Sequence, residues 1–255
     1  MLDAYNVKWT TQSSNASESM PCGGGDIGLN VWVEKGDVLF YMSRSGAFDE
    51  NNVFPKFGRT RIKILPNPFE GGEFLQELKL RDGYVLITGK KNKLHVTVKI
   101  WVDVFNPAIH VTVESNQLIQ VESIYESWRT ENLQWTNPSQ TWASLGFRDA
   151  PFKATIFADS IQFQKNDILF HHQNRDSTLF DATVKQQGLE AIKNELWNPL
   201  KALTFGGKMT GNNFVAAGTV SGIYANTTYK GWKIRSKSSS KKHDVNILKC
   251  KYTSN

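Results

Sequence analysis

The clearest β-strand pattern in the sequence is LHVTVKIWVDV, residues 94–104. Its apolar residues fall on every second position: Leu94, Val96, Val98, Ile100, Val102 and Val104. A period of two over so long a run is typical of a β-strand with one buried face. Asn106 and Pro107 then turn the chain, and residues 109–113 repeat the pattern. We therefore expect an antiparallel hairpin at the centre of a sheet.

The rest of the chain is divided in the same way. Further strand-like segments cover residues 5–9, 27–33, 38–42, 59–65, 74–80, 84–88, 119–129, 154–163, 168–171, 202–209, 213–223, 232–236 and 245–252. Residues 181–196 instead have the apolar spacing of one irregular helix or two short ones. The sequence thus predicts an all-β fold, a large antiparallel β-sandwich with one or two short helices, as a single domain over residues 1–255.

The composition is globular, with 40% hydrophobic and 12% aromatic residues. The formal net charge of +6 raises the question of a nucleic-acid partner. However, the lysines gather in a turn at residues 90–93 and in a Ser-rich stretch at residues 237–242, without a basic helix, a zinc pattern or an RNP-like motif. We expect no nucleic-acid partner. No window approaches the roughly 18 apolar residues of a membrane span, so we expect none.

Cys22 and Cys250 are the only cysteines, and their spacing excludes a CxxC motif. A disulfide between the first and last strands is one alternative, and two buried free thiols are the favoured one. The N-terminus holds no apolar core of signal-peptide length. A periplasmic or extracellular location is expected if a signal peptide was removed, and a cytoplasmic one stays open.

A glycine-rich turn lies in MPCGGGDIGLNVWV, residues 20–33. Neither GxGxxG nor GxxxxGK[ST] is present and a strand follows, which argues against a phosphate-binding loop. We interpret residues 20–26 as a tight loop that delivers the carboxylate of Asp26 to the mouth of a sheet.

Several segments resemble a known family: MPCGGGDIGLNVW (20–32), FPKFGRTRIKILPNPF (54–69), ESWRTE (126–131), HHQNRDSTLFDATVKQQGLE (171–190) and NPLKALTFGG (198–207). The chain resembles the N-terminal β-sandwich domain, a domain of unknown function, of bacterial proteins related to glycoside hydrolase family 95 and similar (α/α)₆-barrel glycosidases. The resemblance implies a supersandwich that assists a catalytic helical barrel, which is missing here. Gly24 stands where an Asn is expected and Cys22 where a larger apolar residue is, so a substrate contact by that Asn is not implied.

Three groups of residues are candidates for carbohydrate binding: Gly24 and Asp26; Trp128 and Arg129; and His171, His172, Asn174 and Arg175. An exposed indole can stack on a sugar face while polar side chains bind the hydroxyls. Trp135 and Trp142 are candidates for the same stacking as Trp128. The alternative is that most of these three tryptophans pack in the core or against another domain.

The histidine pair also raises a metal site. His171 and His172 are adjacent on a predicted strand and point to opposite faces, so a polar patch is favoured and we expect no metal or cofactor. Glycoside hydrolysis needs two facing carboxyl groups, and nothing in the sequence pairs any two of Asp26, Asp49, Glu126, Glu131 and Asp149. No GxSxG elbow occurs either. No catalytic residue is therefore assigned.

The function predicted from these features is that of a non-catalytic accessory domain. Its partners would be a carbohydrate and a catalytic helical barrel, in cis or in trans. The alternatives are a free-standing carbohydrate-binding module and a hydrolase acting alone. An exposed apolar face would favour the first, a concave aromatic groove the second, and a close carboxylate pair in a cleft the third.

Overall fold

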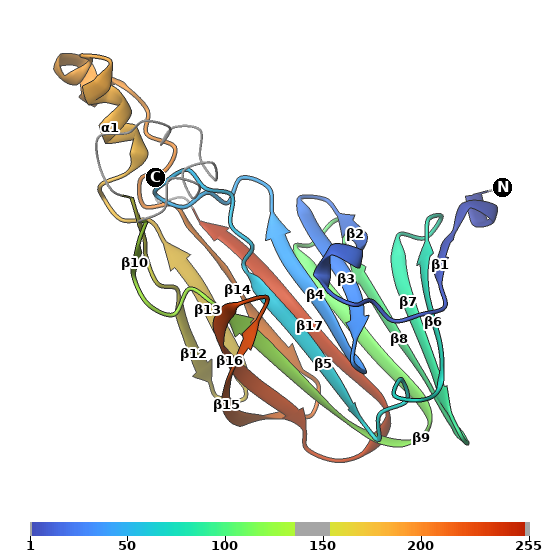
Figure 1. Ribbon diagram of the computed structural model, residues 1–255. Coiled ribbons are helices and arrows are strands. Elements are labelled where there is room, and N and C mark those ends of the chain that lie inside the picture. Colours follow the sequence, from blue (N-terminus) through green and yellow to red (C-terminus); the bar gives the residue numbers. More distant parts are fainter. Residues whose placement is uncertain (1, 136–153, 253–255) are drawn as a thin grey trace.

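Antiparallel strands in two packed layers make up most of the molecule (Figure 1). The computed structural model describes residues 2–135 and 154–252, with side chains up to Leu248. The first layer has the strand order β1 (Val7–Trp9), β6 (Glu73–Lys79), β7 (Tyr84–Lys91), β8 (Leu94–Val102), β9 (Ala108–Ser127), β17 (Ser240–Tyr252), β14 (Thr204–Gly211), β13 (Asp167–Gln173) and β12 (Ser160–Gln164). The second has the order β2 (Met20–Gly24), β3 (Ile27–Glu34), β4 (Asp37–Arg44), β5 (Gly58–Leu65), β9, β16 (Thr227–Ser236) and β15 (Phe214–Tyr224).

The strand β9 belongs to both layers. Its first part pairs with β8 and β17, and its last part pairs with β5 and β16. The sequence predicted two strands here, at 109–113 and 119–129, which is wrong. Residues 114–118 are polar or exposed because the strand passes from one layer to the other there, so the alternation breaks while the backbone stays extended.

The core lies between the two layers and confirms the all-β sandwich prediction. Apolar side chains of β8, such as Val98 and Ile100, meet those of the second layer, such as Phe40 and Ile62, in one buried cluster. The alternation of residues 94–102 therefore fixes which face of β8 is inside. Val104 was placed on that face, but it lies beyond the strand and is 64% exposed.

Helical structure is confined to short pieces. The α-helix α1 (Leu179–Gln186) and the 3₁₀ helix η5 (Glu190–Glu195) correspond to the predicted two short helices. Further 3₁₀ turns are η1 (Leu2–Tyr5) and η2 (Ala16–Glu18), so the first strand is shorter than the predicted 5–9. No helix in the described part of the chain is long and apolar enough to cross a membrane.

Several connections gather at one end of the sandwich, which we call the loop end. It comprises the turn at residues 25–26, residues 45–57, the turn at residues 103–107, the short strands β10 (Leu133–Gln134) and β11 (Thr155–Ile156), and α1 with η5. Backbone hydrogen bonds join Ser45 to Asp26 and Leu179 to Glu50 across these connections. Figure 1 shows α1 projecting from this end, away from the strands.

Candidate functional site

An open pocket on the outer face of the second layer is lined mainly by aromatic and basic side chains. We call it the aromatic pocket, and it has a volume of about 140 Å³. Its lining residues are Tyr41, Lys56, Arg59, Trp128, Tyr224, Ala225, Thr227 and Tyr229. They come from β4, the loop at residues 45–57, β5, the residue that follows β9 and the β15–β16 hairpin.

Strand pairing brings these residues together. Tyr41 of β4 lies opposite Arg59 of β5, and Arg59 lies opposite Glu126 of β9. Tyr41 and Arg59 alternate with core residues, so their side chains point away from the sandwich interior. The row thus carries polar and aromatic groups on the outer face, where β15 and β16 pass in front of the sheet (Figure 1).

The tip of the β15–β16 hairpin forms one wall of the pocket. Tyr224 pairs with Thr227 across a two-residue turn, in which Ala225 and Asn226 have φ of 46° and 62°. Two consecutive positive φ values are the mark of a type I′ turn, whose twist matches that of the flanking strands. The turn fixes the direction in which Tyr224 enters the pocket.

Cations of the protein itself cover several of the rings. The Nζ atom of Lys56 lies 4.1 Å from the ring centre of Tyr41. The guanidinium carbon of Arg59 lies 3.8 Å from the ring centre of Tyr224 and 5.1 Å from that of Tyr229. The Tyr41 ring meets Trp128 edge to face at 5.9 Å. Trp128 is half-buried in the lining of the pocket, and within the described residues no cation stands over its ring.

The position of Tyr224 is held by hydrogen bonds on its far side. Its hydroxyl donates to Glu34 Oε2 at 2.8 Å and accepts from the backbone N–H of Ala16 at 3.1 Å. Burial and then the hydrogen bond to Glu34 raise the pKa of Tyr224 to about 12. The hydroxyl is therefore neutral at physiological pH and acts as a donor.

A buried ion network supports the floor of the pocket. Glu126, only 1% exposed, accepts one hydrogen bond from Arg59 and another, of 2.6 Å, from Arg61. Arg61 also donates to Asp37 at 2.6 Å. Burial acts to lower the pKa of Arg61, but the hydrogen bonds to Glu126 and Asp37 outweigh it and raise that pKa. These ion pairs fix both guanidinium groups in place.

A second cluster of ionisable residues is buried at the loop end. The ring of His172 lies between two carboxylates, with Nε2 3.0 Å from Glu50 Oε2 and Nδ1 3.1 Å from Asp159 Oδ1. Arg129 donates two hydrogen bonds to Asp159, of 2.6 and 3.1 Å. We call these four residues the buried charge cluster. The other carboxylate oxygen of Glu50 is buried without a partner among the described residues.

The geometry of the buried charge cluster favours a charged imidazole. Both ring nitrogens of His172 can donate to a carboxylate only when both carry a proton. Burial acts to lower the pKa of His172, yet the hydrogen bonds to Asp159 and Glu50 outweigh it and raise that pKa. Close by in the chain, burial raises the pKa of Asp49 to about 6. The cluster is closed to solvent, which fits a structural role better than ligand binding.

The residues predicted to form a site do not lie together: some belong to the aromatic pocket, some to the buried charge cluster and some to neither. Trp128 lines the aromatic pocket, whereas Arg129 and His172 belong to the buried charge cluster and Asn174 donates to backbone carbonyls of Phe48 and Leu200. His171 points to the opposite side of β13, as predicted for neighbours on a strand. Arg175 is exposed and lies over the ring of Phe157. Within the described ranges no three His, Cys, Asp or Glu residues form a metal-binding group.

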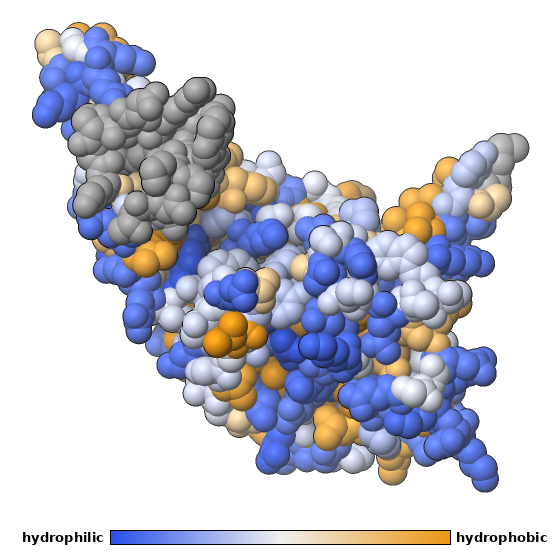
Figure 2. Space-filling view, in the orientation of Figure 1, coloured by the Kyte–Doolittle hydropathy of each residue, from blue (hydrophilic) through white to orange (hydrophobic). Residues whose placement is uncertain are grey.

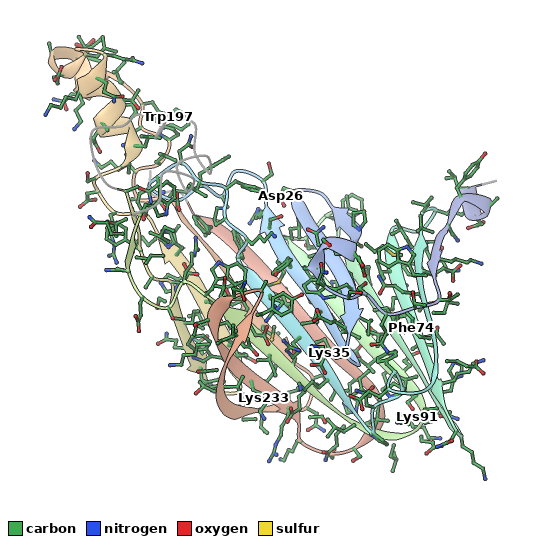
Figure 3. The ribbon with its side chains drawn as sticks, viewed as in Figure 1. Asp26, Lys35, Phe74, Lys91, Trp197 and Lys233 are labelled. Atoms are coloured by element: carbon green, nitrogen blue, oxygen red, sulfur yellow. The ribbon has the colours of Figure 1, made fainter. Side chains whose placement is uncertain are left out.

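The glycine-rich segment is mainly strand. Residues 20–24 form β2 and pair with β3, so the predicted loop at 20–26 is reduced to the turn of Gly25 and Asp26. Gly24 packs against Val102 and Val104, and Asp26 pairs with Arg44 at 2.6 Å. Figure 3 places Asp26 and Lys35 at opposite ends of β3, with Asp26 at the loop end. Cys22 on β2 is a free thiol, half-buried, whose pKa is raised by burial.

Of the carboxylates considered for hydrolysis, the four that the structure describes are not paired with one another in a cleft. The lining of the aromatic pocket contains none. Asp26 is in its ion pair, Asp49 is buried in the loop 45–57, Glu126 lies between two arginines and Glu131 is exposed. Asp149, like Trp142, lies outside the described residues, and Trp135 is buried in a small apolar cluster with Leu179 and Leu200.

Most residues of the aromatic pocket were missed from the sequence. The missed residues are Tyr41, Lys56, Arg59, Tyr224 and Tyr229. The first and the last of them are more than 180 positions apart in the sequence, and only the strand register brings them together. One local signal existed, because Arg59 and Arg61 share the polar face of β5 while Ile62 and Ile64 share the other.

Comparisons with known proteins show one family and a distant structural similarity. Residues 8–255 match the model of the family described as "Domain of unknown function (DUF5703)". A search of curated proteins finds no match. A solved structure described as "Putative kojibiose phosphorylase from human microbiome" is similar with a TM-score of 0.42 and 11% identity, over 97% of this chain and 32% of that one. This chain therefore spans about a third of the length of that protein.

Proposed function

The chain belongs to the family of the "Domain of unknown function (DUF5703)", and we propose that it is a non-catalytic accessory domain that recognises carbohydrate through the aromatic pocket. The observation that carries this proposal is the half-buried indole of Trp128, which lines the pocket among fixed tyrosines and basic groups. A ring face of this kind binds the C–H surface of a sugar, while tyrosine and threonine hydroxyls accept or donate hydrogen bonds to its hydroxyls.

The size of the pocket limits the ligand. Pockets for drug-sized ligands usually have volumes of roughly 300–1,000 Å³, well above the value of about 140 Å³ here. The pocket therefore suits one sugar ring, such as a chain end or a side branch, more than a run of several residues. The lack of a carboxylate in its lining agrees with binding and not with hydrolysis.

The test is replacement of Trp128 with alanine. We expect the affinity for a bound oligosaccharide to fall at least about tenfold, because a central stacking aromatic commonly contributes more than 1–2 kcal/mol to binding. A glycan array would select the probe and titration calorimetry would measure its affinity. Trp101→Ala is the matched control, since Trp101 is also half-buried but lies on β8 and stacks on His110. Unchanged affinity of Trp128→Ala, or no binding by the wild-type chain, would contradict the proposal.

A second role, docking of a catalytic helical barrel at the loop end, is supported by exposed apolar side chains there. Phe105 is 95% exposed, Trp197 83% and Phe54 48%. Figure 3 places Trp197 at the same end as Asp26. Elsewhere, the visible face in Figure 2 is mostly hydrophilic with scattered apolar groups. The resemblance to barrel-associated sandwich domains makes a helical barrel the proposed occupant.

This docking is tested by footprinting. Hydroxyl-radical labelling of Phe105 and Trp197 is expected to fall several-fold when a helical barrel from the same gene or operon is present, because their rings would be covered. Leu118 is the internal control, since it is exposed on β9 at the crossing between the layers. Equal labelling with and without the barrel would remove the loop end as its docking site.

A further inference from the structure

We infer that the aromatic pocket selects an anionic sugar, a ring that bears a carboxylate or a sulfate, over its neutral counterpart. The inference rests on the proposed function and specifies its ligand. The first observation is the charge of the lining, which holds two cations, Lys56 and Arg59, and no carboxylate. A ligand with one apolar face and one negative group complements such a wall.

Lys56 supplies the charge that is free to act. Its side chain is exposed, and it forms no ion pair among the described residues. Its place is nevertheless fixed, because Pro55 and Phe57 on either side are buried and the Phe57 N–H donates to the Met42 carbonyl. The ammonium is thus held at the pocket, 4.1 Å from the Tyr41 ring centre. A ligand carboxylate there would gain a charge-assisted hydrogen bond.

The ion network beneath the pocket leaves the local charge positive. Arg59 and Arg61 share Glu126, while Arg61 and Lys63 share Asp37. Together with Lys56, this part of the sheet therefore carries four cations and only two carboxylates, Glu126 and Asp37. Glu34 adds a third carboxylate, but it is turned toward the Tyr224 hydroxyl and the Trp32 indole behind the pocket. Positive charge remains in excess at the opening.

The occupied ring faces exclude the opposite class of ligand. An aromatic cage can bind an ammonium ligand when its ring faces are free. Here Lys56 covers Tyr41, and Arg59 covers Tyr224 and Tyr229. A cationic ligand would meet like charges, so amino sugars and methylated amines are disfavoured. A bare inorganic anion has no apolar face to place on Trp128 and would use only part of the site.

The experiment compares matched sugars by titration calorimetry. The probes are disaccharides that end in glucuronate, in glucose 6-sulfate or in glucose, and the corresponding galactose series. The wild-type chain is expected to bind an anionic member at least tenfold more tightly than its neutral partner. Raising the salt concentration should weaken only the anionic members, since salt screens exposed charge. The carboxylate and sulfate arms show which anionic group the pocket accepts.

Lys56→Gln is the decisive variant. It should lower the affinity for the anionic probe by a larger factor than the affinity for the neutral one, and so remove most of the preference. Lys35→Gln is the control, because Lys35 is an equally exposed lysine in the β3–β4 turn and does not line the pocket (Figure 3). Equal wild-type affinity for neutral and anionic sugars, with loss of both in Trp128→Ala, would overturn this inference and leave the proposed function intact. An anionic preference that survives Lys56→Gln would also overturn it, and no sugar binding at all would overturn both.

Discussion

Replacing Glu126 with glutamine is expected to lower the free energy of unfolding by about 3–5 kcal/mol, the usual cost of breaking a buried ion pair by removing one partner. Glu126 is 1% exposed and receives both Arg59 and Arg61. Glutamine keeps the volume but removes the charge, so Arg59 loses its only carboxylate among the described residues, while Arg61 retains Asp37. Urea denaturation of the wild type and of Glu126→Gln at pH 7 measures the difference in their free energies of unfolding.

The control for this variant is Glu114→Gln. Glu114 pairs with Lys242 at 2.9 Å, but both side chains are more than half exposed. Solvent screens such a pair, and its loss is expected to change stability by no more than about 1 kcal/mol. A second comparison adds Arg59→Met to Glu126→Gln, which removes the unpaired buried charge and should restore part of the stability. A loss below about 1 kcal/mol for Glu126→Gln would show that the pocket floor does not depend on this carboxylate.

The strands of the sandwich could be predicted from the sequence because each depends on local alternation. In β8 the apolar residues Val96, Val98 and Ile100 are all buried, as their period of two requires. The continuity of β9 could not be predicted. Its residues 114–118 leave one layer for the other, and two of the strands that pair with β9 on either side of this crossing, β17 and β5, are distant in sequence.

The aromatic pocket depends on information that no single segment carries. Arg59 and Glu126 are 67 residues apart, and their contact follows from the register between β5 and β9. Tyr224 reaches the same place only because the turn at Ala225 and Asn226 folds β15 and β16 together. A type I′ turn usually contains Asn-Gly or Asp-Gly. Ala-Asn is a weak signal, so the hairpin tip was not recognised from its sequence.

Polarity alone also does not separate binding residues from structural ones. Trp128 and Arg129 are neighbours in ESWRTE, yet Trp128 lines an open pocket and Arg129 donates to Asp159 in the buried charge cluster. Adjacent residues at a strand end point in different directions. The histidine pair divides in the same way, with His172 buried between carboxylates and His171 on the other side of β13. Burial, which the sequence does not report, decides the role of each.

His172→Phe is expected to destabilise the protein most at low pH. Phenylalanine preserves the ring that stacks on Phe205, but it removes both N–H donors. Glu50 and Asp159 are then buried without the cation between them, although Asp159 keeps Arg129. We expect a loss of about 3–5 kcal/mol at pH 6, because a buried charge loses its partner. Urea denaturation from pH 6 to pH 9 measures it.

The pH dependence distinguishes the charged imidazole from simple packing. Since the pKa of His172 is raised in the folded state, its stabilising contribution is complete below its unfolded pKa of about 6.5 and is lost as the pH rises through the folded pKa. The wild-type free energy of unfolding should therefore fall above pH 6.5, and His172→Phe should lack this decrease. Asp49, whose pKa is about 6, also makes the free energy of unfolding fall with rising pH, but in a lower range, between about pH 4 and pH 6.

Two further variants serve as controls. His171→Phe, on the opposite side of β13, should retain the wild-type pH profile. Adding Glu50→Gln to His172→Phe should restore part of the stability. Parallel profiles for the wild type and His172→Phe above pH 6.5 would show that the imidazole is neutral in the folded protein.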